Sequence, residues 1–258
     1  MTADGPGSPE QSRHRDPVRA LLLAVIIVCA AVLLVLLLPG AVPADLRSRL
    51  GVGGPATARA GSYAFLAHQP GDPRAPVTYS PCSAVRIQVN PAGGPVDAVA
   101  LVQRAMSRVG AATGLRLEYA GLTTARPQWK SAYLPALAQE ATQSDAPVLV
   151  SWATPQEVHE LDGDVAGIGG SVWVREGNAQ RHYVTGGVTL DAGAFQQLAQ
   201  RPDAEAEEEA IILHEFGHLV GLAHVNDPGE LMYAHNIGRT GFGPGDLAGL
   251  ALLGEGSC

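Results

Sequence analysis

The chain has 258 residues, of which 46% are hydrophobic, so it can bury a substantial core in one or two domains. It carries 17 basic and 25 acidic residues and a formal net charge of -8. Because neutralising phosphates requires a basic face, this acidic composition argues against a nucleic-acid-binding protein.

Residues 20–38 form a run of 19 uncharged, almost wholly aliphatic side chains. A helix over this run would be roughly 28 Å long, close to the thickness of the hydrocarbon core of a bilayer. We expect a retained transmembrane anchor, with residues 1–19 as a short cytoplasmic tail. The alternative is a cleaved secretory signal, whose apolar core is usually shorter, about 7–15 residues. Three arginines precede the run and two follow it closely, a thin positive-inside bias that places residues 39–258 outside the cytoplasm.

Residues 39–81 are rich in Gly, Pro, Ala and Arg and show no sustained periodicity, which predicts a spacer before a folded domain over residues 82–258. Since Cys29 lies in the apolar run, Cys82 and Cys258 remain as a pair for an oxidising compartment. Their disulfide would close a very long loop and add up to about 5 kcal/mol of stability. The alternatives are two unpaired thiols, or a free Cys82 that covers a metal.

Elements of two kinds alternate in the first part of the predicted domain. Strands are expected where apolar residues alternate or run together, at 84–90, 115–119, 148–152, 167–174 and 183–190. A helix should begin at Pro95 and end at Gly110 or Gly114, since its apolar residues recur every three or four positions. Gly169 and Gly170 in one strand could let an extended peptide backbone approach closely; a bulge or turn is the alternative.

Two further helices are expected in the last third of the chain. The first begins near Pro202 or Asp203, and its run of glutamates complements the positive end of a helix. The second runs from Pro244 to about Gly254.

The sequence HEFGHLVGLAH, residues 214–224, has the spacing of a metal site. His214 and His218 are four residues apart and share one face of a helix, while Gly221 lets the helix end so that His224 can join them. Three imidazoles and a water give zinc one exchangeable position, as in catalytic rather than structural centres. Glu215 borders this site, where a general base acting on a metal-bound water must stand.

This segment matches the extended H-E-x-x-H-x-x-G-x-x-H signature of the metzincin zinc endopeptidases, and Met232 falls at the position of their Met-turn. Within the clan the chain resembles the matrixins over about residues 82–254. The dominance of arginine, alanine and glycine suggests a bacterial member. The resemblance implies an α/β (α+β) fold: a five-stranded, mostly parallel, twisted sheet with one antiparallel edge strand, a motif helix and a C-terminal helix.

The resemblance also implies roles for individual residues. His214, His218 and His224 would bind one catalytic zinc, Glu215 would be the base, and Met232 would form an apolar floor. Tyr233 and the residues that follow it would line the pocket for the substrate side chain after the cut.

The sequence departs from the clan's patterns at two positions. Ala234 stands where astacin-like members have a metal-reaching tyrosine, and Val225 replaces the matrixin serine. Additional structural Zn²⁺ or Ca²⁺ would need donors such as His159, Asp162, Asp164 and His182. Their spacing does not reproduce the family element, so ordinary loop polarity is the better interpretation.

The sequence therefore predicts a monomeric, single-pass membrane-anchored zinc endopeptidase that cleaves peptides or proteins outside the cytoplasm. One alternative is a metal-stabilised domain that binds extended peptides without cutting them. Another is a soluble protease that is secreted after its signal is cleaved.

Overall fold

The structure, a computed structural model, describes residues 61–136, 146–175, 180–235 and 237–258. The predicted anchor at residues 20–38, the tail before it and residues 39–60 of the spacer lie outside the described residues. Within the described ranges, no helix is both long and apolar enough to cross a membrane. All of these ranges belong to one compact unit, Arg59–Cys258.

Six strands form the main sheet: β3 (Thr78–Tyr79), β4 (Val85–Asn90), β5 (Leu117–Leu122), β8 (Val148–Ala153), β9 (Gly167–Val174) and β10 (His182–Asp191). β10 pairs in parallel with β8, which is followed by β4 and then β5. β9 runs antiparallel to β10 along nearly its whole length and so occupies the opposite side of it from β8. The two-residue β3 pairs only with the first residues of β10.

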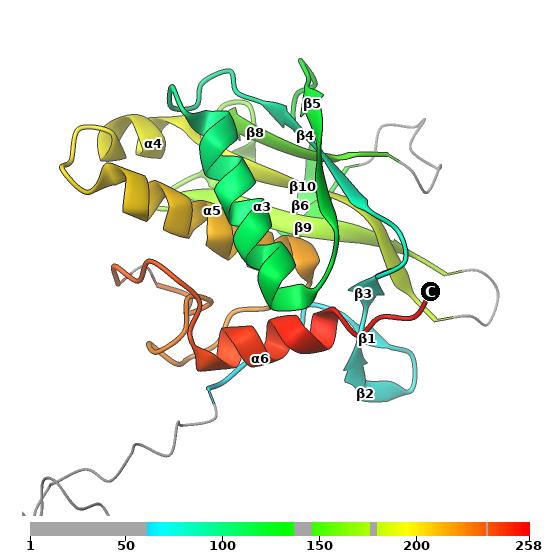
Figure 1. Cartoon of the computed structure of the whole chain (residues 1–258). Coiled ribbons are helices and arrows are strands. Elements are labelled where there is room, and N and C mark those ends of the chain that lie inside the picture. The colour runs from blue at the N-terminus through cyan, green and yellow to red at the C-terminus, as the bar shows by residue number, and fades with distance from the viewer. Residues whose placement is uncertain (1–60, 137–145, 176–179, 236) are drawn as a thin grey trace, which may run out of the picture. The chain divides into compact units, whose positions relative to one another are not determined.

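Four α-helices lie in the described part of the chain: α3 (Ala98–Thr113), α4 (Ala192–Leu198), α5 (Ala204–Val220) and α6 (Pro244–Leu253). Figure 1 shows α3 and α5 packed side by side on one face of the sheet, with α6 across their lower ends. Between this face and the helices lies the main core, which includes Ile87, Leu101, Ile212, Phe216 and Leu219. In β4 the buried Val85, Ile87 and Val89 alternate with more exposed polar residues, as a strand covered on one face requires.

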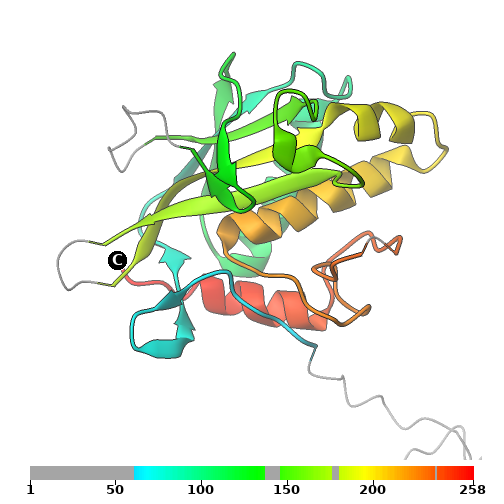
Figure 2. The same cartoon turned by 180° about the vertical axis from the view of Figure 1, so that it is seen from behind.

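The other face of the sheet carries a small hairpin and a helical turn (Figure 2). The hairpin consists of β6 (Trp129–Ser131) and β7 (Leu134–Pro135), and the 3₁₀ turn η1 spans His159–Leu161. Trp129 packs against a second, smaller apolar cluster formed by Ala153, Val158, Leu161 and Ile168. Part of the long connection between the second and third predicted strands therefore packs on this face.

The mixed, mostly parallel sheet agrees with the expected fold class. The five longer strands match the five expected segments, and β9 is the antiparallel one. The sixth strand, β3, and the short helix α4 were not expected. α4 follows β10 directly, and its N-cap Asp191 accepts a hydrogen bond from the backbone N–H of Ala194 at 2.5 Å.

The second half of the predicted spacer belongs to the folded unit. β1 (His68–Gln69) and β2 (Asp72–Pro76) form an antiparallel pair, and Val77 and Tyr79 enter the main core. The backbone N–H of Leu66 donates to the carbonyl oxygen of Gly221 at 2.9 Å, just after the motif helix. The structural boundary therefore lies before residue 82, because these scattered apolar residues are buried even though they show no periodicity.

The two ends of the predicted domain are joined covalently. Cys82 and Cys258 form a disulfide with their Cα atoms 5.4 Å apart, which closes a loop of 176 residues. Cys82 thus does not cover the histidine cluster as a free thiol.

Candidate metal centre

The motif helix α5 carries His214, Glu215 and His218 and packs against β9. Glu205 and Glu207 in its first turn stabilise the positive end of the helix. The helix ends at Gly221, whose φ of 123° places it in the region that favours glycine. The N–H of Gly221 bonds back to the carbonyl oxygens of Gly217 and His218, and the chain then turns to bring His224 alongside the helix.

The three histidines meet through their Nε2 atoms. The distances between these atoms are 3.0 Å for His214 and His224, 3.1 Å for His214 and His218, and 3.1 Å for His218 and His224. The corners of such a triangle lie about 1.8 Å from its centre, close to the usual zinc–imidazole distance of ~2.0–2.1 Å, so the spacing of the three nitrogens fits zinc. Among the residues that the structure describes, this is the only group of three or more His, Cys, Asp or Glu residues that could hold a metal ion.

The hydrogen bonds on the other ring nitrogens show which form the imidazoles take. The Nδ1 atom of His214 lies 2.8 Å from the carbonyl oxygen of Leu231, and that of His218 lies 2.8 Å from the carbonyl oxygen of Leu222. Because a carbonyl oxygen only accepts, each Nδ1 carries the proton and each Nε2 keeps a lone pair. Lone pairs facing one another at these distances repel unless a cation lies among them, so the donor set fits a metal ion.

Burial keeps these rings neutral, which is the form that binds a metal. Desolvation lowers the pKa of His214 to about 4 and lowers the pKa of His218 well below its ordinary value. Desolvation also lowers the pKa of the more exposed His224.

Glu215 is buried beside the histidines, with 6% of its surface exposed. Its Oε2 atom has no hydrogen-bond partner in the described part of the molecule, and burial raises the pKa of its carboxyl group to about 8. Gly167 of β9 makes room for it, since a Cβ there would lie 2.8 Å from the Glu215 Cγ. A buried carboxyl group with one unpartnered oxygen, next to three converging imidazoles, is suited to proton transfer beside a bound cation.

The turn around Met232 packs against the motif helix beside the cluster. Met232 is fully buried, and a Cβ on Gly217 of α5 would lie 2.6 Å from its sulfur atom. The carboxylate of Asp246, in the first turn of α6, accepts the backbone N–H groups of Leu231 at 2.5 Å and Met232 at 3.3 Å. Asp246 was missed in the sequence, where its position in the first turn of the last helix was the only signal.

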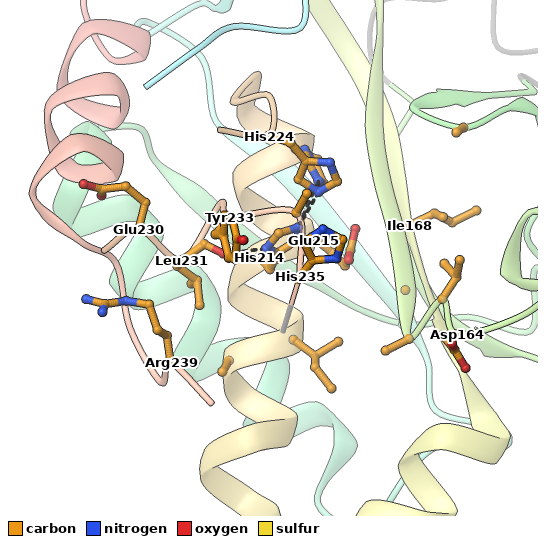
Figure 3. A pocket seen from close by; sticks show the side chains of 18 of the residues that line it. Asp164, Ile168, His214, Glu215, His224, Glu230, Leu231, Tyr233, His235 and Arg239 are labelled. Atoms are coloured by element: carbon orange, nitrogen blue, oxygen red, sulfur yellow. Dashed lines mark hydrogen bonds between the residues drawn. The ribbon is translucent and has the colours of Figure 1, made fainter. Parts of the chain in front are cut away.

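A cavity of about 310 Å³ adjoins the histidines. Figure 3 shows Leu231 and Arg239 on one side of the cluster and Ile168 and Asp164 on the other. Tyr233, which was predicted to line the substrate pocket, lies on the wall of this cavity, and its ring packs edge-on against His235 with the centroids 5.5 Å apart. α5 itself contributes the apolar Ala210 and Ile211 to the lining of this cavity.

Gly169 and Gly170 allow other backbone segments to approach closely. These segments belong to the chain itself and not to a bound peptide. A Cβ on Gly169 would overlap the carbonyl oxygen of Glu215, and a Cβ on Gly170 would overlap the backbone of Tyr133. β9 thus contacts α5 at Gly169 and the β6–β7 hairpin at Gly170. Among the described strands β9 pairs only with β10, so its outer edge has no β partner.

Tyr133 is a site residue that sequence reasoning missed. Its hydroxyl lies 3.3 Å from Nδ1 of His224, and its ring packs edge-on against His218 with the centroids 4.8 Å apart. Its φ of 65° is the only positive φ of a non-glycine residue in the described chain, a conformation that costs on the order of 1–3 kcal/mol. No local pattern marks Tyr133, because its partner His224 lies 91 residues further along.

The candidate donors for a second metal do not come together. The Nδ1 atom of His159 lies 3.8 Å from a carboxylate oxygen of Asp162, and both side chains are largely exposed. Asp164 lines the main cavity, and His182 begins β10.

A buried glutamate beside three converging histidines, on a helix packed against a mixed sheet, defines a metzincin-type metallopeptidase centre. The family model described as Peptidase_M10, Matrixin, matches residues 122–241, which include the whole motif. Over these residues the chain is similar to the matrixins, a family of metallopeptidases.

The chain was also compared with solved structures and with curated proteins. Metalloproteinase II from Bacteroides fragilis aligns with 16% identity and a TM-score of 0.33, over 71% of this chain and 52% of its own. The chain thus spans about half the length of that protein. No curated protein matches the chain.

Proposed function

We propose that this protein is a zinc endopeptidase in which Glu215 is the general base. The observation that carries the proposal is the convergence of three Nε2 atoms at 3.0–3.1 Å beside the buried carboxyl group of Glu215, whose Oε2 atom has no hydrogen-bond partner in the described part of the molecule. Bound zinc would supply an acidified water and would polarise the carbonyl group of the substrate. In that reaction Glu215 would take up the proton that the attacking water loses and would pass it to the leaving amine as the peptide C–N bond breaks.

The proposed substrate is an extended peptide or protein segment on the outer edge of β9. Among the described strands that edge has no partner, and an edge without a partner is a template for an added strand. The adjoining apolar cavity, with Tyr233 on its wall, would receive the side chain after the cut. Met232 would support the zinc ligands from below.

We further propose that the enzyme is a monomer anchored by residues 20–38, with the peptidase unit outside the cytoplasm. The disulfide between Cys82 and Cys258 supports this placement, because such bonds persist in oxidising compartments. Intact-mass measurement of the mature protein tests it. A measured mass that corresponds to a chain containing residues 20–38 supports an anchor. A mass that corresponds to a chain starting after residue 38 supports a secreted enzyme.

The experiment that tests the activity compares the purified full chain with Glu215→Gln. Zinc content and cleavage of an unstructured protein are measured for both, with Glu205→Gln as a control at the exposed start of the same helix. We expect Glu215→Gln to retain zinc but to lose cleavage by at least about 100-fold, because general base catalysis contributes typically 10²–10⁴-fold. If the wild-type chain holds zinc and binds peptides but never cleaves them, the protein is a peptide-binding domain instead.

A further inference from the structure

The three histidines differ in what holds their outer nitrogens. His214 and His218 both lie on α5, and each bonds through Nδ1 to a backbone carbonyl oxygen at 2.8 Å. His224 lies beyond the end of the helix and is the exposed member of the three. Its Nδ1 meets the hydroxyl of Tyr133, a side chain from a distant loop. The third histidine therefore obtains from a distant side chain an interaction that the other two obtain from backbone carbonyl groups.

We propose that Tyr133 is a positioning residue of the metal centre, whose hydroxyl accepts the Nδ1–H of His224 and holds Nε2 towards His214 and His218. This inference rests on the proposed role of the three histidines as zinc ligands. Outer groups of this kind fix the tautomer and the orientation of a ligating histidine.

The surroundings of Tyr133 hold it in place on two sides. A positive φ in a non-glycine residue persists only where neighbouring contacts fix the backbone. At Tyr133 one such contact is with Gly170 of β9, where the lack of a side chain lets the two backbones touch, since a Cβ on Gly170 would overlap the backbone of Tyr133. The hairpin that carries Tyr133 is fixed to the sheet by the indole N–H of Trp129, which donates to the hydroxyl of Thr189 at 2.9 Å. The hairpin that places the hydroxyl next to His224 is thus itself held against the sheet.

The ring of Tyr133 has a second contact that agrees with this role. It packs edge-on against the rings of both His218 and His224, with centroid distances of 4.8 Å and 6.2 Å. Tyr133 also lines the cavity, so its hydroxyl could alternatively serve the substrate. The experiment must therefore measure metal binding separately from activity.

The test uses the full chain, Tyr133→Phe and, as a matched control, Tyr119→Phe on the exposed face of β5. Zinc affinity is measured by competition with a chelator, and the visible absorption of the cobalt-substituted protein reports ligand geometry. We expect Tyr133→Phe to bind zinc about 10- to 100-fold more weakly and to alter the cobalt spectrum, because outer partners of metal ligands have effects of this size. Tyr119→Phe should match the wild type in both.

Gly170→Ala provides a second variant, because its Cβ displaces the Tyr133 backbone while the hydroxyl remains. It should weaken zinc binding, and the double variant should lose little more than Tyr133→Phe alone, since both act on one contact. Thermal unfolding of each metal-free variant shows whether it folds.

Several outcomes would overturn the role of Tyr133. The loss of an outer partner should weaken zinc binding at least ~10-fold. If Tyr133→Phe folds and its zinc affinity stays within about threefold of the wild type, the role is refuted. Loss of cleavage with unchanged zinc affinity and cobalt spectrum would also refute it and would place the hydroxyl on the substrate. A wild-type chain that binds zinc but does not cleave would refute the proposed activity alone, and one that binds no zinc would refute both.

Discussion

The carboxylate of Asp246 accepts the backbone N–H of Leu231 at 2.5 Å, which ties the last helix to the turn beneath the metal centre. The carbonyl oxygen of Leu231 in turn accepts Nδ1–H of His214 at 2.8 Å. α6 therefore reaches a candidate metal ligand through two hydrogen bonds. Asp246 is almost fully buried and also accepts the N–H of Gly243 at 2.9 Å, so its carboxylate organises three backbone groups.

Replacing Asp246 should destabilise both the fold and the site. Asp246→Ala leaves three buried N–H groups without this acceptor, and we expect the free energy of unfolding to fall by about 2–4 kcal/mol. Urea unfolding of the metal-free chain measures this loss. Asp246→Asn keeps one acceptor oxygen and should lose less. A change below about 0.5 kcal/mol for Asp246→Ala would contradict a structural role for these bonds.

The close contact between β9 and α5 predicts a sharp difference between two glycines of neighbouring strands. A Cβ on Gly169 would overlap the backbone of Glu215, so Gly169→Ala must separate β9 from α5. We expect a loss of more than about 2 kcal/mol in unfolding free energy, together with weakened zinc binding. Gly187→Ala on β10 is the control, since its Cβ would meet atoms only at 3.5 Å or beyond. Equal stability of the two variants would show that this interface adapts freely.

Acid should remove one specific contribution to stability. Burial raises the pKa of Glu209, but the hydrogen bonds from Arg108 and Arg104 outweigh it, and the net pKa lies below the ordinary 4.5. A lowered folded pKa means that this stabilisation is complete above about pH 4.5 and is lost as the pH falls through the folded value.

The measurement is the unfolding free energy of the wild type and Glu209→Gln from pH 7 to pH 3. We expect Glu209→Gln to be about 1–3 kcal/mol less stable at pH 7 and the difference to shrink in acid. Glu205→Gln, which removes only an exposed partner of Arg104, should cost less than about 1 kcal/mol. If the difference in unfolding free energy between the wild type and Glu209→Gln stays constant from pH 7 to pH 3, the ion pairs of Glu209 with the two arginines do not contribute to stability.

The disulfide should support the fold without taking part in the chemistry. Replacing Cys82 and Cys258 together by serine removes a cross-link over 176 residues, and we expect a stability loss of up to about 5 kcal/mol. Zinc affinity and cleavage, measured well below the unfolding temperature, should be unchanged. A gain in activity on reduction would instead indicate that the cross-link restrains the site.

The sequence by itself determined the local part of the site and the class of the fold. His214 and His218 share a helix face because four residues make about one turn, and Gly221 ends that helix because it tolerates positive φ. Glu215 follows from the same helical spacing. The five longer strands were predictable because residues covered by one face of a sheet alternate along the chain.

The tertiary structure decided the contacts between segments that are distant in sequence. The bond of Tyr133 to His224, the capture of the Met232 turn by Asp246 and the burial of Val77 in the core have no periodic signature. The same holds for Gly169 and Gly170, whose neighbours proved to be α5 and the hairpin. Periodicity reports only which face of an element is buried. Which other element covers that face depends on how the whole chain packs.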